Sequence, residues 1–450
     1  MLDALTSLAA FAVAISVLVA IHEYGHYIVG RWAGMKVLRF SIGFGRPLVK
    51  WTRGADRTEY CIAAIPLGGY VRFLDGRDGP VAAGDEGRAF NHRPIPWRIA
   101  VLLAGPAFNF LFAIAAYWAL FLSGIPTLVP AIGEVEKGSI AADAGLEFGD
   151  RIVAVGETET ADWESALVAM LDRMVADGRI PVTVEDTEGR ARRTVLEVGG
   201  AATRLTEPGV LFDGLGFRPW QPPAVIGELT EGGAAEAAGL AVGDRITAVA
   251  GEPVSSYNDL VGVVSTRPHE EVRIDFVRHG EPRSVTAVLG EHEVDGEVRG
   301  LLGVRGSNEL GSYYYLRKYG PLDSLAAGVE RTWATTVFTV RMLGRMITGD
   351  VSIKNISGPI NIAQFAGTSA ERGLNEFLGF LALVSISLGV LNLLPVPVLD
   401  GGQIVYQSVE LVKGSPLSER AQLIGQQVGI FALILLMSFA FYNDIARILG

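Results

Sequence analysis

Cysteine is nearly absent from this chain. Among 450 residues only Cys61 is a cysteine, so neither an intrachain disulfide nor a cysteine-based metal site can form. Positive charge is not in excess either, and the formal net charge of −11 argues against a nucleic-acid partner. A mean hydropathy of +0.33 is too apolar for an ordinary soluble enzyme, whereas 19% charged residues are too many for a chain wholly in lipid. We therefore expect membrane helices joined to water-soluble modules.

The N-terminus also lacks the basic region and the small-residue cleavage site of a secretory signal. Its apolar run from Leu2 to Val29 exceeds the about 20 residues that cross the hydrocarbon layer, which predicts a retained first span. Three further apolar stretches predict spans at residues 99–125, 377–394 and 428–449. Residues 322–347 have a helical period but contain three arginines, so an amphipathic helix at the membrane interface is expected there.

The basic residues of the first loop set the expected orientation. Twelve Lys and Arg lie between Gly30 and Arg98, and the positive-inside rule places that loop in the cytoplasm. With four spans, residues 126 to about 370 and both termini are then extracytoplasmic, whereas the stretch after Leu394 returns to the cytoplasmic face.

The first span carries an H-E-x-x-H motif at residues 22–26. Positions i and i+4 share one face of a helix, so His22 and His26 can hold one zinc ion, and Glu23 can act as general base toward the attacking water. The alternative is a chance match. Imidazole and carboxylate groups are costly in a bilayer, which favours a functional site.

The middle of the chain contains an internal repeat. The pattern A-G-L-x-x-G-D-R-I occurs at residues 144–152 and again at 238–246. Each copy follows a short run of small residues and precedes β-rich sequence. The pattern resembles bacterial PDZ domains, which bind peptides by adding a strand to a sheet edge; the alternative is another duplicated β-module with Gly-Asp turns.

A catalytic zinc usually takes three protein ligands and leaves one position open, so a third ligand is needed. The candidates in or beside spans are Asp400, Glu376, Asp444, Glu59, Asp75 and His92. Asp444 and Glu376 belong to the extracytoplasmic ends of their spans, far from the histidines. Asp400 follows Pro395 and Pro397 at the cytoplasmic side, so the predicted topology selects it. Its alternative role is a helix N-cap.

The H-E-x-x-H motif on a first span, the tandem repeat and the segment Asn392–Gly402 together resemble the site-2 protease family of intramembrane metalloproteases. The resemblance covers nearly the whole chain. Further matching segments are 41–45, 66–71, Gly105-Pro106 with Asn109, 357–360 and Asn443-Asp444.

This resemblance implies a zinc ion held by His22, His26 and Asp400, with Glu23 as acid/base. It also implies a substrate contact from Asn392 and an edge strand near Gly43 and Gly45 that holds an extended substrate. The implied substrate is a single-pass membrane protein, typically an anti-sigma factor already shortened outside the cytoplasm in an envelope stress response. The tandem PDZ domains would bind a peptide or protein or act as a size filter, and lipids would surround the spans.

The expected fold is therefore a polytopic α-helical protein of the bacterial inner membrane, with four transmembrane helices, a membrane-associated β-hairpin region and two extracytoplasmic PDZ domains. The expected segments are 1–35 (first span), 36–96 (β region), 97–125 (second span), 126–218 and 219–306 (PDZ domains), 307–372 (amphipathic helix region), 373–402 (third span and third ligand), 403–422 (cytoplasmic-side segment) and 423–450 (fourth span).

Two other hypotheses stand beside the intramembrane protease. The first is a non-catalytic, membrane-anchored PDZ scaffold whose metal site is structural; it predicts a closed zinc shell. The second is a zinc protease facing the cytoplasm with a downstream Glu as third ligand. The Gly-rich, β-like sequence that follows His26 argues against the second.

Overall fold

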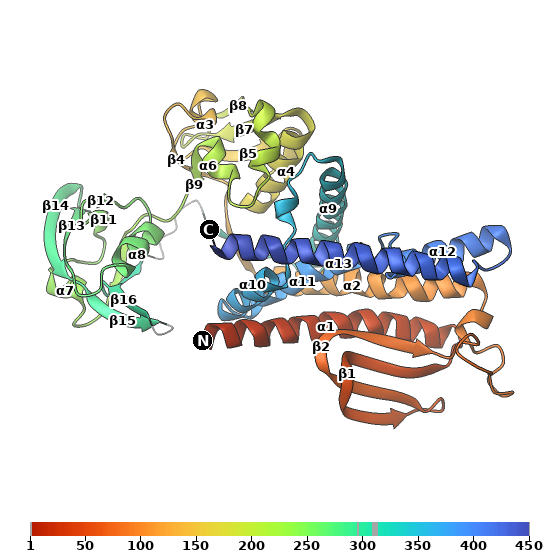
Figure 1. Cartoon of the computed structure of the whole chain (residues 1–450). Helices are drawn as coiled ribbons and strands as arrows, with labels where there is room; N and C mark the ends of the chain where they lie inside the picture. Colours follow the sequence, from red (N-terminus) through yellow and green to blue (C-terminus); the bar gives the residue numbers. More distant parts are fainter. Residues whose placement is uncertain (1, 295–296, 308–313, 450) are drawn as a thin grey trace. The chain divides into compact units, whose positions relative to one another are not determined.

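The computed structural model describes residues 2–294, 297–307 and 314–449 (Figure 1). The chain divides into two compact units. One unit joins Met1–Ile125 to Arg317–Gly450, and the other is Pro126–Leu316. Strands β3 (Ile125–Leu128) and β18 (Tyr314–Arg317) lie where the chain passes between the units.

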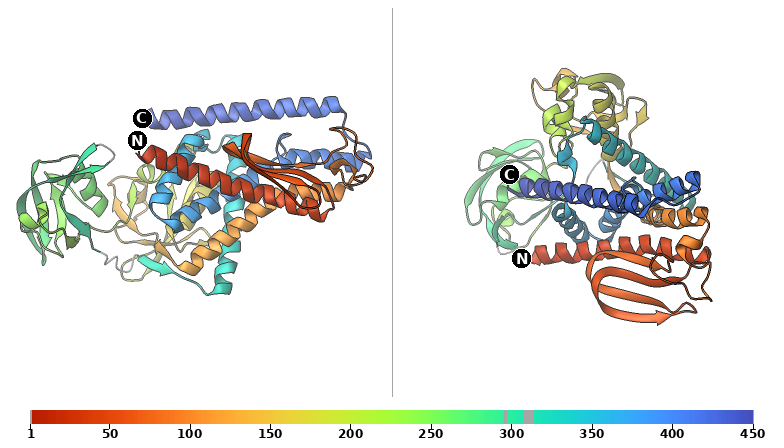
Figure 2. Two further views of the ribbon diagram at one scale, coloured as in Figure 1. Left: turned by 90° about the horizontal axis from the view of Figure 1, so that it is seen from below. Right: turned by 45° about the vertical axis from the view of Figure 1, so that its right-hand side comes forward.

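Four helices of the first unit are long and apolar enough to cross a membrane, as judged over the described part of the chain. They are α1 (Leu2–Trp32), α2 (Ile95–Ser123), α11 (Leu374–Asn392) and α13 (Glu419–Leu449). The apolar window of α2 is 39% buried and that of α13 only 11%, so α2 is the central helix and α13 leaves most of its apolar surface uncovered. The chain is thus a multi-pass membrane protein. Both termini lie at the same end of the helical unit (Figures 1 and 2).

Three more helices surround the apolar ones. Helix α9 (Pro321–Thr348) packs against α2, and α10 (Pro359–Glu371) packs against α1 and α11. Helix α12 (Asp400–Lys413) contacts α2. Helix α9 occupies the stretch predicted to be amphipathic, and its arginines keep it outside the set of span candidates. Two short 3-10 turns, Phe90–His92 and Ile353–Asn355, lie in the connections.

A β-sheet follows α1. It is made of β1 (Val37–Arg53) and β2 (Thr58–Phe73), which pair in an antiparallel manner. Residues 39–42 of β1 pair with both the beginning and the end of β2, whereas residues 47–53 pair with its beginning only. Residues 69–73 are therefore an outer strand, and part of β2 lies next to α1. Several large apolar side chains of this sheet, including Leu48 and Trp51, are exposed, as expected of a sheet in contact with lipid.

The second unit contains two modules whose elements follow the same order as far as the last strand of each four-stranded sheet, and differ after it. The first module has a four-stranded sheet of order β6-β5-β7-β8, and the second has one of order β12-β11-β13-β14. The first consists of β4 (Ile132–Val135), α3 (Ile140–Asp143), β5 (Arg151–Val155), β6 (Thr158–Glu159), α4 (Trp163–Asp177), β7 (Arg179–Glu185), β8 (Ala191–Glu197), α5 (Ala202–Leu205), α6 (Leu211–Leu215) and β9 (Phe217–Pro219), with a 3-10 turn at Gly199–Ala201.

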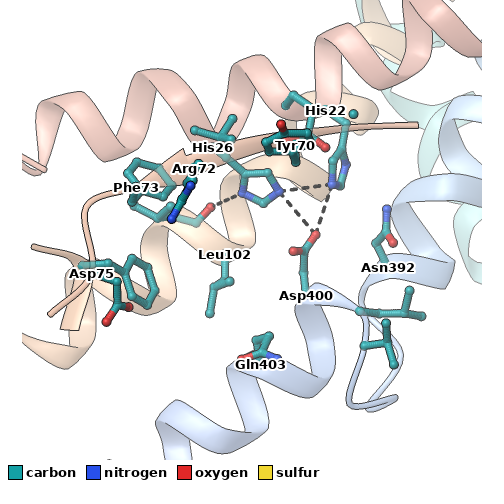
Figure 3. A pocket seen from close by; sticks show the side chains of 17 residues that line it. His22, His26, Tyr70, Arg72, Phe73, Asp75, Leu102, Asn392, Asp400 and Gln403 are labelled. Atoms are coloured by element: carbon teal, nitrogen blue, oxygen red, sulfur yellow. Dashed lines mark hydrogen bonds and ion pairs between the residues drawn. The ribbon is translucent and has the colours of Figure 1, made fainter. Parts of the chain in front are cut away.

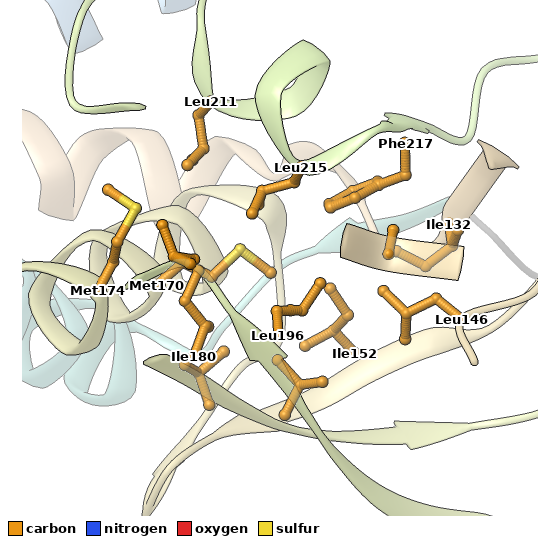
Figure 4. Close-up of a cluster of buried hydrophobic side chains, with 14 of the residues drawn as sticks. Ile132, Leu146, Ile152, Met170, Met174, Ile180, Leu196, Leu211, Leu215 and Phe217 are labelled. Carbon is orange, nitrogen blue, oxygen red and sulfur yellow. The ribbon is translucent and has the colours of Figure 1, made fainter. Parts of the chain in front are cut away.

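The second module consists of β10 (Ile226–Leu229), α7 (Ala234–Ala237), β11 (Arg245–Val249), β12 (Glu252–Pro253), α8 (Tyr257–Ser265), β13 (Glu271–Arg278), β14 (Glu281–Val288), β15 (Gly290–Val294), β16 (Glu297–Leu301) and β17 (Val304–Gly306). Strand β4 pairs with β9, and β10 pairs with β17. Each module has its own apolar core; that of the first is built around Ile152, Met170 and Phe217 (Figure 4).

The repeated Gly-Asp motif forms the same turn in both modules. The carboxylate of Asp150 accepts a hydrogen bond from the N–H of Glu147, and that of Asp244 accepts one from the N–H of Ala241, both at 2.8 Å. The glycine before each aspartate has a φ near +90°, a conformation that other residues rarely adopt. An arginine pairs with each aspartate, Arg192 in the first module and Arg278 in the second. The repeat is therefore one turn built twice.

Candidate metal centre

The two histidines of the motif project from one face of α1 toward α2. Their Nε2 atoms are 3.1 Å apart, and both residues are buried. Glycines allow this close approach of the helices. A Cβ on Gly25 would lie 2.3 Å from the carbonyl oxygen of Ala104, and a Cβ on Gly105 would lie 2.4 Å from Nε2 of His26. The Gly105-Pro106 segment of α2 thus leaves the space that the imidazoles occupy.

Asp400 reaches the same point from the other end of the chain. Helix α11 ends at Asn392, the prolines that follow prevent its continuation, and α12 begins at Asp400. The Asp400 Oδ2 atom lies 3.2 Å from Nε2 of His22 and 3.5 Å from Nε2 of His26 (Figure 3). The structure therefore brings His22, His26 and Asp400 together, with one ligand atom from each within 4.8 Å of the others.

This group fits a zinc ion. Two imidazoles and one carboxylate are a common set of three protein ligands, and such a set leaves one position open for catalysis. The Oδ2 atom of Asp400 is buried and faces the Nε2 atoms of both histidines; a cation between these three groups would offset the cost of burying the carboxylate. A closed four-ligand shell is not formed by these residues.

A cavity of about 460 Å³ adjoins the three residues and includes Glu23 among its lining residues. The Glu23 carboxylate lies against the backbone N–H of Val71 in the outer strand of the sheet. A Cβ on Gly69 would lie 3.1 Å from Cγ of Glu23 and 2.6 Å from the carbonyl oxygen of Ser41. Glycine at position 69 therefore lets the outer strand approach the motif. Asn392 also lines this cavity, at the end of α11 (Figure 3).

Gly43 and Gly45 both lie in β1. Neither lines the cavity; the glycine that does so is Gly69. Their φ angles of +90° and +87° give a conformational reason for glycine at both positions, and a Cβ on Gly43 would lie 2.9 Å from the carbonyl oxygen of Ala63. Their part in substrate binding stays a prediction.

The other candidate ligands have other partners. Asp444 accepts hydrogen bonds from three backbone N–H groups at the start of α10, and Glu59 pairs with Arg39. Asp75 lines the cavity but pairs with Arg77; burial opposes ionisation of Asp75, yet the hydrogen bonds from Arg77 outweigh it and lower the pKa of this carboxyl. The last two candidates, Glu376 and His92, lie in the first turn of α11 and in a 3-10 turn.

Sequence reasoning named Asn109 in a matching segment but assigned no role to the groups behind the histidines. The Nδ1 atom of His26 lies 2.7 Å from the carbonyl oxygen of Val101, and that of His22 lies 3.1 Å from Nδ2 of Asn109. A backbone carbonyl has no sequence signal. Asn109 does have one, because an uncharged polar residue in the middle of an apolar span is usually there to form a hydrogen bond.

Comparison with known proteins finds one peptidase family and several proteases that are similar to this chain. The model of peptidase family M50 matches residues 10–436. The chain is 41% identical to the regulator of sigma E protease of Salmonella typhi and 40% identical to the regulator of sigma-E protease RseP of Escherichia coli K12, in each case over 100% of both chains. It is 39% identical to a putative zinc metalloprotease of Vibrio cholerae, again over 100% of both chains.

Proposed function

Because the chain belongs to peptidase family M50 and is a zinc metalloprotease of the site-2 type, we propose that it cleaves a peptide bond within a transmembrane segment of a single-pass membrane protein. The observation that carries this proposal is the meeting of His22, His26 and Asp400 beside an apolar helix bundle. In the proposed site these three residues are the zinc ligands.

Bound zinc supplies Lewis acidity, which polarises the scissile carbonyl and acidifies the attacking water. Glu23 takes a proton from that water and passes a proton to the leaving amine. The Val71 N–H beside Glu23 holds the carboxylate toward the cavity. The Asn392 amide, at the end of α11, is placed to contact the substrate backbone near the scissile bond.

A transmembrane helix has to unwind before its peptide bonds can be cleaved, because its backbone groups are paired with one another. The outer strand of the sheet provides new partners for an unwound segment. Residues 69–73 pair with β1 on one side, and no other described strand pairs with them. We place substrate binding by β-addition at this strand rather than at Gly43 and Gly45.

The names of the relatives support one substrate class. Two of them are named as regulators of sigma E and match over their full length, which supports an anti-sigma factor of the inner membrane as substrate. We propose that the two modules of the second unit are extracytoplasmic PDZ domains that bind a peptide or exclude substrates that have not been shortened. Removing both should allow full-length substrates to be cleaved; continued resistance of those substrates would refute the filter.

The charge pattern supports the orientation. The sheet and the start of α12 are proposed to lie at the cytoplasmic side, because the twelve basic residues of the first loop belong to that region. The common position of both termini agrees with four spans, and we propose that both lie outside the cytoplasm.

The test uses the purified full-length enzyme in detergent with a tagged single-pass anti-sigma factor, supplied shortened and intact. Mass spectrometry should locate one cut within the membrane segment of the shortened form. A zinc chelator should abolish this cut, and added zinc should restore it. Glu23→Gln is tested in the same assay. Glu376→Gln is its matched control, because it makes the same chemical change at an exposed glutamate of α11. Absence of cleavage of any substrate would favour the scaffold.

A further inference from the structure

Each of the two histidines has two tasks, one for each ring nitrogen. One nitrogen binds the metal and the other donates a hydrogen bond to the group behind the ring. A neutral imidazole carries one N–H, and only the other nitrogen has a lone pair for a metal. In His26 the assignment is clear, because Nδ1 lies 2.7 Å from the carbonyl oxygen of Val101 and a carbonyl can only accept. Nδ1 of His26 therefore carries the hydrogen, and its Nε2 offers a lone pair toward Asp400.

In His22 the group that faces Nδ1 does not suit a ring that binds metal through Nε2. Its Nδ1 faces Nδ2 of Asn109 at 3.1 Å. If the amide nitrogen donates, Nδ1 is the acceptor and the hydrogen of the ring lies on Nε2, the atom that faces Asp400. A protonated nitrogen cannot bind a metal. At the same time Oδ1 of Asn109 is buried and accepts no hydrogen bond from the described residues.

Turning the carboxamide by half a turn resolves the conflict, since its two ends have the same shape. Oδ1 then accepts a hydrogen bond from Nδ1–H of His22, and Nε2 of His22 has its lone pair free. We propose that Asn109 is a positioning residue that holds His22 in the zinc-binding tautomer through its Oδ1 atom. This inference rests on the proposed role of His22 as a zinc ligand.

The surroundings of Asn109 suit this task. The residue is fully buried, and its own backbone carbonyl accepts a hydrogen bond from Ser385 Oγ of α11 at 2.9 Å. It lies one turn after Gly105, the residue that makes room for the imidazoles. Helix α2 therefore orients both histidines from behind, His26 through the carbonyl of Val101 and His22 through the amide of Asn109.

The expected effect is on metal affinity. Loss of a partner behind a ligating histidine typically weakens metal binding by about 10- to 100-fold. Asn109→Ala should therefore raise the Kd for zinc by about that factor. Asn109→Asp should stay within about threefold of the wild type, because either carboxylate oxygen accepts from Nδ1–H and carboxylates commonly fill this position.

Zinc affinity is measured on the purified full-length apoenzyme in detergent, by competition with a fluorescent zinc chelator. Ser385→Ala is the matched control, because it removes a hydrogen bond between α2 and α11 at Asn109 and leaves the carboxamide in place. It should bind zinc like the wild type. His22→Ala tests the premise and should lose zinc.

Weak zinc binding by Asn109→Ala, with near-normal binding by Asn109→Asp and Ser385→Ala, would support the inference. Wild-type affinity in Asn109→Ala would overturn it. Equal weakening in Asn109→Asp, or in Ser385→Ala, would also overturn it, because the effect would then come from helix packing. If His22→Ala still binds zinc like the wild type, the proposed metal site itself is wrong, and this result is distinct from the others.

Discussion

Replacing Arg98 with methionine is expected to destabilise the helical unit by about 3 kcal/mol. Arg98 lies in the first turn of α2 and forms two hydrogen bonds with Glu410 in the last turn of α12, at 2.8 and 3.2 Å. Because α12 begins at Asp400, this ion pair joins the helix of the third candidate ligand to the helix that lies behind the histidines.

The magnitude follows from the burial of the pair. The Arg98 side chain is 9% exposed and that of Glu410 is 20% exposed, so removing one partner leaves a charge that water reaches poorly. Breaking a buried pair in this way costs about 3–5 kcal/mol. Partial access of water to Glu410 places the expected value at the lower end of that range. Removing both charges together should cost less than either single change, because no charge is then left unpaired.

The assay is a double-mutant cycle on the full chain in mixed micelles, with unfolding by SDS followed by circular dichroism. The variants are Arg98→Met, Glu410→Met and the double change, with a coupling energy of about 2 kcal/mol expected. Arg72→Met is the control, because Arg72 pairs with Asp78 while both side chains are more than half exposed; it should change stability by less than about 1 kcal/mol. The reasoning would be refuted if the losses of stability in the two single variants added up to the loss in the double variant. It would also be refuted if the single variants were as stable as the control.

Three further predictions follow from named contacts. Gly69→Ala should lower kcat by about 100-fold with zinc still bound, because a Cβ there would lie 2.6 Å from the Ser41 carbonyl oxygen and 3.1 Å from Cγ of Glu23 and so push the outer strand and Glu23 apart; unchanged kcat would contradict this. Asp444→Ala should destabilise the helical unit by about 1–2 kcal/mol in the same SDS titration, because three backbone N–H groups lose their acceptor, and a wild-type midpoint would contradict it. Burial opposes ionisation of Asp244, but hydrogen bonds from Arg278 outweigh it and hold the pKa of this carboxyl below 3.8. This stabilisation is complete above the unfolded-state pKa and is lost as the pH falls through the lowered pKa of the folded state. Hydrogen exchange in β11 should therefore accelerate below about pH 4 in the wild type and change less in Arg278→Met. Equal acceleration in both proteins would contradict this prediction.

Much of the helical architecture follows from the sequence. Apolar length predicted the four candidate spans, and the arginines of residues 322–347 set α9 apart from them. Asp400 was chosen as the third ligand candidate from the side of the membrane on which each segment ends. The distribution of basic residues predicts that side. Even a motif as short as H-E-x-x-H was informative, because its place in an apolar run leaves few alternatives.

Other features depend on contacts that no local pattern encodes. The rotation of α2 about its axis decides that Asn109, and not another polar residue, faces His22. The register of the sheet decides that Gly69 and Val71 lie beside Glu23 while Gly43 and Gly45 do not. The predicted topology set Asp444 aside as a ligand but could not show its actual partners, which are backbone groups far away in the sequence.

The central claim is that this site combines zinc with Glu23 to hydrolyse a peptide bond. The most direct test compares Glu23→Gln with the wild type in zinc content and in cleavage of the shortened substrate. We expect one zinc ion per chain in both proteins and a loss of cleavage of at least about 100-fold in the variant. Cleavage at the wild-type rate by a zinc-loaded Glu23→Gln enzyme would contradict the account.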